Sequence, residues 1–277
     1  MPIIKTREEL PDIQNSLEGF PKKTIKKVGT RNVELPIGVQ RKDGSINYST
    51  ANISLYTDLN DSTKGINMSR LRIVLEELIL DKHLLVDTFI RELLKETKTR
   101  LDSKHSYAKI KFDYFLVKEA PVSKMESHLN CKCIIEGRHI EGQEDKLYLT
   151  VQVPYTSLCP CSREISQYGA HNQPSLADIK VELIPDNICW IEELVDLVES
   201  VASAPIRNIL KREDEAYMTE LAYERPMFVE DMIRGISVKL DERLDNNIAD
   251  YSVVVNHYES IHQQYAVAII TAGRSLQ

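Results

Sequence analysis

The chain has 277 residues, of which 42% are apolar and 28% are charged. This length suits one large domain or two smaller ones, and the ordinary apolar fraction excludes a disordered chain. The net charge of −7 argues against a general nucleic-acid-binding protein, although a few local cations could hold a small anionic substrate. No apolar run approaches the roughly 20 residues of a membrane-spanning helix, and the N-terminus lacks a secretory signal, so we expect a cytoplasmic protein.

Strand patterns begin after a polar, irregular stretch at residues 1–28, which predicts a surface arm. Apolar residues at every second position predict strands, with a turn at 42–44 inside the first segment and a hairpin turn at 141–145. The predicted strand segments lie at 31–58, 110–116, 147–153, 179–183, 251–255 and 265–270.

Helix patterns, with apolar residues three and four apart, lie between these strands. Ser69 precedes the first helix, where a hydroxyl N-cap is favoured, and Pro205 opens a later one. The predicted helices cover 69–80, 84–98, 191–201, 206–223 and 228–236. Strands, helices and strands therefore occur twice, which predicts an α+β protein made of two copies of one module, placed at 1–155 and 156–277.

The segment from Val153 to Gln173 carries the residues best suited to chemistry. It leaves a predicted strand and places Cys159, Cys161 and His171 in what we expect to be a loop. A loop can fold a thiolate and an imidazole ten residues apart onto one ion, and both are ligands that zinc accepts. The alternative is that the two cysteines are small buried apolar residues and the histidine an ordinary loop residue.

The other cysteines favour plain packing. Cys131 and Cys133 have the same spacing as the later pair, but they lie in a strand-like run among apolar residues, and Cys189 precedes a helix. Four paired cysteines could instead form a closed structural zinc site, which would make the chain a non-catalytic binding module.

Three further groups are weaker candidates. His257 and His262 lie near the last turn, and Glu259 stands three residues before His262. Glu215 and Glu230 lie in acidic helical regions and by themselves would not be singled out. The stretch Lys64-Gly-Ile-Asn-Met-Ser-Arg70 precedes a helix, where backbone N–H groups with Lys64, Ser69 and Arg70 suit phosphate oxygens, or where Ser69 is simply a cap.

Together these segments resemble one family, the prokaryotic type IB GTP cyclohydrolases of the tunnelling-fold superfamily. The resemblance covers nearly the whole chain, and its most specific part is the Ser-Leu-Cys-Pro-Cys-Ser block followed by Gly-Ala-His-Asn-Gln. The segments that carry it are Lys64–Arg70, Thr156–Ser162, Tyr168–Gln173, Phe228–Asp231 and Tyr258–His262.

The resemblance implies a fold, an assembly and a reaction. Two tandem tunnelling-fold modules, each an antiparallel sheet backed by paired helices, would form barrels in a homotetramer with active sites between subunits. The implied reaction converts GTP and water to 7,8-dihydroneopterin triphosphate and formate, the first step of folate synthesis and, in many bacteria, of queuosine synthesis.

The resemblance also assigns roles to residues. The metal ligands would be Cys161, His171 and Glu215, with Cys159 open as an alternative thiol. Glu230 would be a carboxylate close to the metal and His262 the proton-transfer residue, while Glu259 would grip the purine N–H edge, with Lys64, Ser69 and Arg70 at the triphosphate. The family often has an arginine where this chain has Pro174, and Arg163 or Arg70 would compensate.

The chemistry is consistent with these roles. Opening a purine ring at C8 needs hydroxide and a proton donor, which a divalent metal and a histidine supply. Zinc suits a thiolate and an imidazole best, whereas a carboxylate ligand also admits manganese or iron. The alternative enzyme within the superfamily is an NADPH-dependent nitrile reductase, in which Cys161 would attack the substrate covalently.

Overall fold

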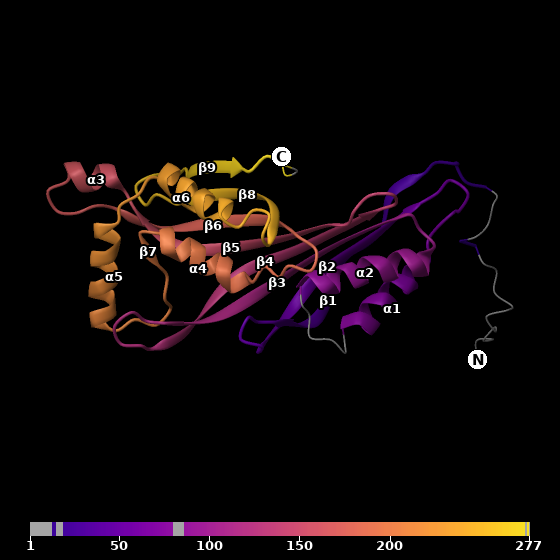
Figure 1. Cartoon of the computed structure of the whole chain (residues 1–277), viewed down its shortest axis with the longest axis horizontal. Coiled ribbons are helices and arrows are strands. Elements are labelled where there is room, and N and C mark those ends of the chain that lie inside the picture. Colours follow the sequence, from indigo (N-terminus) through magenta and orange to yellow (C-terminus); the bar gives the residue numbers. More distant parts are fainter. Residues whose placement is uncertain (1–12, 15–18, 80–85, 275, 277) are drawn as a thin grey trace.

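The computed structural model describes residues 13–14, 19–79, 86–274 and 276. In these ranges, one continuous antiparallel sheet has the strand order β1-β2-β3-β4-β5-β6-β8-β9, and the two-residue β7 pairs with β5 (Figure 1). The strands are β1 Ile25–Gln40, β2 Ile46–Leu59, β3 His105–Glu119, β4 Glu126–Ile140, β5 Lys146–Leu158, β6 Asn172–Leu183, β7 Ala204–Pro205, β8 Ile248–His257 and β9 Ala266–Thr271.

The longer helices pack against this sheet. In Figure 1, α1 and α2 lie on the half made by β1 to β4, and α4 and α6 lie on the half that ends in β9. Gly137 of β4 lies under α2, where a Cβ atom would come within 2.9 Å of a Leu94 methyl. The helices are α1 Met68–Ile79, α2 Val86–Leu101, α3 Pro160–Ile165, α4 Ile191–Val201, α5 Arg212–Glu224 and α6 Val229–Asp241.

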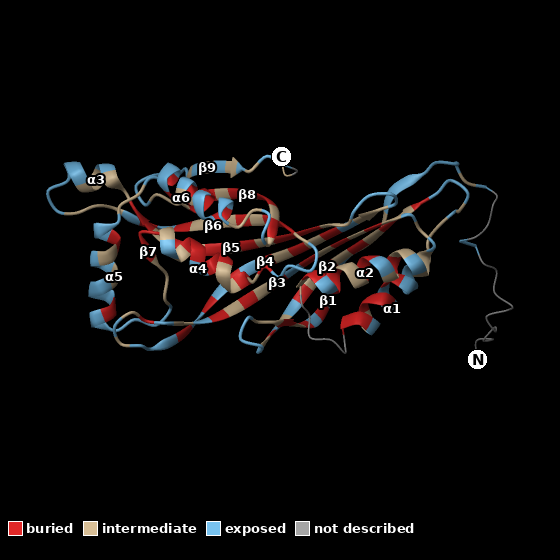
Figure 2. Cartoon of the chain, viewed as in Figure 1, coloured by how far each residue is buried: buried red, intermediate tan, exposed pale blue. Residues whose placement is uncertain are grey.

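Most of the core is one contiguous layer between the sheet and α1, α2, α4 and α6. A small second cluster joins Leu158 of β5, Ala204 of β7 and Ala222 of α5. Because alternate residues of a strand share a face, cross-strand pairing carries a buried row across the sheet. Figure 2 shows the buried positions following the strands under the helices. One such row consists of the directly paired residues Phe112, Cys133, Val151, Ile179 and Val253.

Most predicted elements are confirmed within a few residues, but several local predictions are wrong. The predicted arm at 1–28 lies largely outside the described residues, and its last part is wrong, because β1 begins at Ile25. Ser69 lies inside the first turn of α1 rather than before it, and its hydroxyl donates to Asn67 Oδ1 at 2.6 Å. Pro205 pairs with Tyr155 in β7 instead of opening a helix, so α5 starts only at Arg212.

The predicted boundary between residues 155 and 156 falls inside β5. This strand pairs with β4 through its first half and with β6 through most of its length, so hydrogen bonding is continuous across the boundary. The division of the chain into two modules stays a prediction. Among the described residues, no helix combines the length and the apolar character needed to cross a membrane.

Candidate functional site

The segment between β5 and β6 forms a short helix, α3, where the sequence predicted a loop. Pro160, with its fixed φ and missing N–H, occupies the first helical position. Cys159 is the N-cap, and its sulfur accepts a hydrogen bond from the Ser162 N–H at 3.5 Å. Cys159 is therefore half-buried, whereas Cys161 lies in the first turn and is exposed.

His171 lies directly against the start of this helix. The Cys159 N–H donates to the His171 carbonyl at 3.1 Å, and the His171 N–H donates to Ser162 Oγ at 3.2 Å. These two bonds close the segment into a compact loop and hold the backbone of His171 against the start of α3. The structure thus brings the predicted cysteine pair and histidine together.

The imidazole of His171 has a buried partner that the sequence analysis missed. Its Nδ1 lies 2.8 Å from Gln173 Oε1, and Gln173 Nε2 donates to Ser157 Oγ at 2.9 Å. With Nδ1 engaged, Nε2 is the ring nitrogen left for a ligand. The alternation along β6 could have revealed Gln173, since it places a glutamine at a core position.

The turn between β8 and β9 brings a second predicted pair to the same place. The Tyr258 N–H donates to the Pro174 carbonyl at 3.2 Å, and Ser260 Oγ donates to the Asn172 carbonyl at 3.3 Å. In this turn, Glu259 Oε2 lies 3.7 Å from His262 Nε2. Glu259 and His262 therefore lie beside the strand start that follows His171.

His257, at the end of β8, points into the interior instead of the turn. It is buried, and its Nε2 lies 2.9 Å from the Tyr155 hydroxyl. Burial lowers the pKa of His257 to about 4, while the Glu230 carboxylate acts in the opposite direction. Glu230 is in the first turn of α6, so this predicted residue also lies at the site end of the sheet.

Glu215 lies farther from the thiols. Helix α5 meets α3 through its last turn, where the Arg163 guanidinium lies 4.6 Å from the centre of the Tyr223 ring. Glu215 is in the first turn, eight residues or about 12 Å along the axis from Tyr223. Within the described part of the chain, no three histidine, cysteine, aspartate or glutamate side chains come together as a metal site.

The first turn of α5 is nonetheless firmly anchored by Asp214. This buried carboxylate accepts hydrogen bonds from the backbone N–H groups of Val122, Ser123 and Lys211 and from the Ser123 hydroxyl. Burial opposes ionisation of Asp214, but these hydrogen bonds outweigh it and hold the pKa of the carboxyl well below its usual range. The loop between β3 and β4 therefore fixes the helix that carries Glu215.

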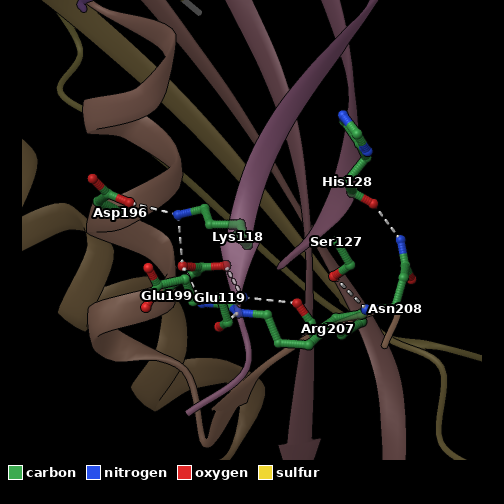
Figure 3. Close-up of polar contacts among 9 residues, drawn as sticks. Lys118, Glu119, Ser127, His128, Asp196, Glu199, Arg207 and Asn208 are labelled. Carbon is green, nitrogen blue, oxygen red and sulfur yellow. Dashed lines mark hydrogen bonds and ion pairs between the residues drawn. The ribbon is translucent and has the colours of Figure 1, made fainter. Parts of the chain in front are cut away.

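A polar cluster, shown in Figure 3, anchors the segment that leads into α5. Glu199 of α4 accepts from Lys118 Nζ at 2.9 Å and from Arg207 Nη1 at 2.7 Å. Arg207 also donates to the Glu119 carbonyl, and Asn208 donates to the His128 carbonyl at 2.6 Å. These contacts tie α4, the ends of β3 and β4, and the approach to α5 into one rigid unit.

The predicted phosphate-binding residues lie elsewhere in the chain. Arg70 Nη1 donates to the Arg100 carbonyl at 3.1 Å, which holds the start of α1 against the end of α2. Figure 1 shows α1 and α3 toward opposite ends of the long axis of the molecule. A single chain therefore does not bring Lys64, Ser69 and Arg70 to the thiols.

The remaining cysteines are confirmed as core residues. Cys131 and Cys133 are buried in β4, and burial raises the pKa of Cys131 to about 12. Burial likewise raises the pKa of Cys189 to about 12. Cys133 pairs with Val151, eight residues or about 26 Å of strand from Cys159, so the two cysteine pairs cannot share one ion. The alternative prediction of a closed zinc site made of four cysteines is therefore wrong.

Comparison with known proteins identifies the family. A family model for type I GTP cyclohydrolase FolE2 matches residues 10–268. The chain belongs to this family. It is 41% identical over 265 residues to GTP cyclohydrolase FolE2 of Magnetococcus marinus, covering 96% of this chain and 97% of that protein. GTP cyclohydrolase FolE2 of Nitrosococcus oceani is 39% identical over 246 residues, covering 89% of each chain.

Solved structures show the fold. The uricase of Arthrobacter globiformis superposes with a TM-score of 0.58 at 9% identity, covering 94% of this chain and 97% of that one. Urate oxidase of Bacillus sp. TB-90 gives a TM-score of 0.54 at 10% identity, covering 89% and 99%. The family member therefore has the tunnelling fold of these enzymes.

The donors present at the α3 end fit a divalent metal in part. Cys161 offers an exposed thiol, and the hydrogen bond on Nδ1 of His171 leaves Nε2 available, the arrangement usual for metal-binding histidines. A thiolate with an imidazole is a zinc-type pair, and a third donor has to come from outside this immediate cluster.

Proposed function

We propose that this family member is a metal-dependent GTP cyclohydrolase that converts GTP and water to 7,8-dihydroneopterin triphosphate and formate, the first step of folate synthesis. One observation carries the proposal. Two separate parts of the chain, the α3 segment with Cys161 and His171 and the final turn with Glu259 and His262, meet at one end of the sheet. The named relatives supply the substrate, since each is a GTP cyclohydrolase.

Cys161 and His171 would hold the metal, with zinc the best match to the pair and manganese or iron as alternatives. When bound, such an ion would lower the pKa of water from its high value in bulk to about 7 and so supply hydroxide at neutral pH. His262 is exposed beside Glu259 and would give and take protons at the purine ring. The Glu259 carboxylate would accept from the guanine N1–H and amino group, a bidentate match.

The rest of the site would come from other subunits. Within one chain, Lys64, Ser69 and Arg70 lie far from Cys161, and the first turn of α5 holds Glu215 away from the thiols. A homotetramer whose modules close into barrels would place these residues beside the α3 segment of another copy. They would then supply the triphosphate contacts and the third metal ligand, while Glu230 stays close to the metal as a carboxylate.

The direct test is an assay of the purified protein with GTP. We expect formate and pterin fluorescence to appear together, to be lost with a chelator and to return with zinc, manganese or iron. Because NADPH plays no part, its addition should change nothing, which separates this enzyme from a nitrile reductase. A protein that releases no formate with any of the three metals would contradict the proposal.

Variants of the final turn test the roles of its two residues. His262→Ala should keep the metal content of the wild type and lose turnover, because the histidine moves protons and does not ligate. Glu259→Ala should raise the Kd for GTP without changing metal content. Metal loss in His262→Ala would instead make that histidine a ligand, and an unchanged GTP affinity in Glu259→Ala would reject the purine contact.

A further inference from the structure

The core changes character at the end of the sheet that carries His171. On the helix-covered face, three neighbouring strands carry apolar rows through Val153 in β5, Ala177 in β6 and Val255 in β8. The same rows then turn polar without becoming exposed. The continuing positions are Tyr155 and Ser157, Ser175 and Gln173, and His257, each at most 2% exposed.

These side chains form one hydrogen-bonded chain. Gln173 Nε2 donates to Ser157 Oγ at 2.9 Å, and Ser157 Oγ lies 2.8 Å from Ser175 Oγ. Ser175 interacts with the Tyr155 hydroxyl across β5 and β6. The Tyr155 hydroxyl lies 2.9 Å from His257 Nε2, which closes the chain in the interior.

The donors and acceptors at the two ends of this chain are defined. Burial raises the pKa of Tyr155 and lowers that of His257, so a neutral phenol meets a neutral imidazole. A neutral phenol is a good donor to the lone pair of a neutral imidazole. Tyr155 therefore donates to His257, and the Gln173 amide N–H donates to Ser157. Ser175 bonds to Ser157 and Tyr155, and its hydroxyl also lies 3.4 Å from the Gln173 carbonyl. The bond from Gln173 to Ser157 turns Gln173 Oε1 toward His171.

Packing alone gives no reason for such a chain. A buried polar group that loses its partner costs about 1–3 kcal/mol, and the apolar residues that precede these positions fill the same rows without that risk. This hydrogen-bonded chain lies at the end of the sheet that carries His171. Together these hydrogen bonds fix the orientation of the Gln173 amide. The amide cannot flip without breaking its hydrogen bond to Ser157 Oγ.

We propose that Gln173 is a positioning residue for the metal site, held by the buried chain of Ser157, Ser175, Tyr155 and His257. Its Oε1 accepts the Nδ1–H of His171, fixes that tautomer and the plane of the ring, and presents Nε2 to the metal. This inference rests on the proposed function, because it assumes that His171 is a ligand. It adds a residue of the interior to a site otherwise built from surface segments.

Zinc affinity tests the inference without relying on turnover. Metal-free full-length protein is titrated with Zn²⁺ against a chromophoric chelator, and GTP cyclohydrolase activity is measured in parallel. Gln173→Leu, which removes both hydrogen bonds at similar size, should weaken zinc binding by about 10- to 100-fold. Gln173→Glu keeps an oxygen facing Nδ1–H and should stay closer to the wild type than to Gln173→Leu.

A matched glutamine serves as the control. Gln152 lies on β5 but on the opposite face of the sheet, where it interacts with Asp178. Gln152→Leu should leave zinc affinity unchanged. Should Gln173→Leu fail to fold, Ser157→Ala removes only the group behind the amide and should weaken zinc binding in the same direction by a smaller factor.

The outcomes separate the two proposals. If the wild type binds zinc, hydrolyses GTP and loses both on His171→Ala, the proposed function stands. If Gln173→Leu then binds zinc as tightly as the wild type, the positioning role alone is overturned. The same holds for Ser157→Ala if Gln173→Leu does not fold. Equal losses in Gln173→Leu and Gln173→Glu would overturn it too, because the acceptor oxygen would not matter. A wild type with no affinity for zinc, manganese or iron would overturn both.

Discussion

Two Cys-x-Cys pairs with the same spacing have opposite environments in this molecule. Cys131 and Cys133 lie in the middle of β4, and both are buried among the apolar residues under the helices. Cys159 and Cys161 lie where β5 has just ended, and there one thiol caps a helix while the other is exposed.

The difference comes from the backbone between the two thiols. In a strand, residues two apart point to the same face, so Cys131 and Cys133 enter the core together. Pro160 starts a helix between the other two, and a helix turns residues two apart by about 200°. Spacing therefore indicates chemistry only when the secondary structure that carries it is known.

The largest expected effect is a loss of activity, which should follow substitution in one Cys-x-Cys pair and not in the other. Cys161→Ala should reduce GTP turnover to background and lower metal content, because it removes the exposed thiolate of the proposed site. Cys133→Ala should keep turnover and metal content, since its thiol contacts only the core. Steady-state formate release and metal analysis of both variants check this. A fully active Cys161→Ala variant would contradict the claim that Cys161, unlike Cys133, belongs to the metal site.

Alkylation sharpens the same contrast. In the metal-free protein, iodoacetamide should modify Cys161 first, Cys159 more slowly, and Cys131 and Cys133 only after unfolding, because burial hinders access and raises the pKa of both core thiols. Zinc should protect Cys161. Peptide mass mapping over time measures the order, and modification of Cys133 in the folded protein as fast as that of Cys161 would refute it.

The buried polar end of the core should show in the pH dependence of stability. The pKa of His257 is about 4 in the folded chain against about 6.5 when unfolded, so above pH 6.5 both states are neutral and the histidine has no effect. As the pH falls to 4, only the unfolded state takes up the proton, which costs the fold about 3 kcal/mol.

His257→Gln should therefore lose less unfolding free energy than the wild type between pH 6.5 and 4, as measured by urea denaturation at each pH. The control is His128→Gln, at an exposed position, which should keep the wild-type pH dependence. A His257→Gln variant with the full wild-type loss would show that this histidine is protonated in the folded chain.

The smallest expected effect is on stability, and it should also differ between the two Cys-x-Cys pairs. Cys133→Ser buries a hydroxyl in an apolar row and should lower the unfolding free energy by about 1–3 kcal/mol. Cys161→Ser changes an exposed side chain and should stay within about 0.5 kcal/mol. Urea denaturation of the metal-free variants measures both. Equal losses would mean that Cys161 is packed as tightly as Cys133.

Local patterns in the sequence were sufficient for most of the fold. Period-two alternation located most of the long strands, since alternate residues along them are buried. Local patterns failed where tertiary contacts decide. Pro205 joins β7 because Tyr155 offers it a pairing partner, and α5 starts where Asp214 meets the β3–β4 loop.

The candidate site residues could be chosen from the sequence as a set, but their arrangement could not. The thiols, His171, Glu259 and His262 stand out by type and motif, and backbone hydrogen bonds bring them together. Gln173 was missed because its role depends on the interior behind it. The distance from the thiols to Glu215 follows from the length of α5, and the distance to Lys64 follows from the long sheet. No local pattern in the sequence describes either.

The central claim is that one divalent metal binds a single thiolate, that of Cys161, together with the imidazole of His171. X-ray absorption spectroscopy of the zinc-loaded protein tests it directly. The account predicts one sulfur at about 2.3 Å and nitrogen or oxygen ligands at about 2.0–2.2 Å, with the sulfur lost in Cys161→Ala. Zinc coordinated by several sulfurs, or zinc that keeps a sulfur ligand in Cys161→Ala, would contradict the claim.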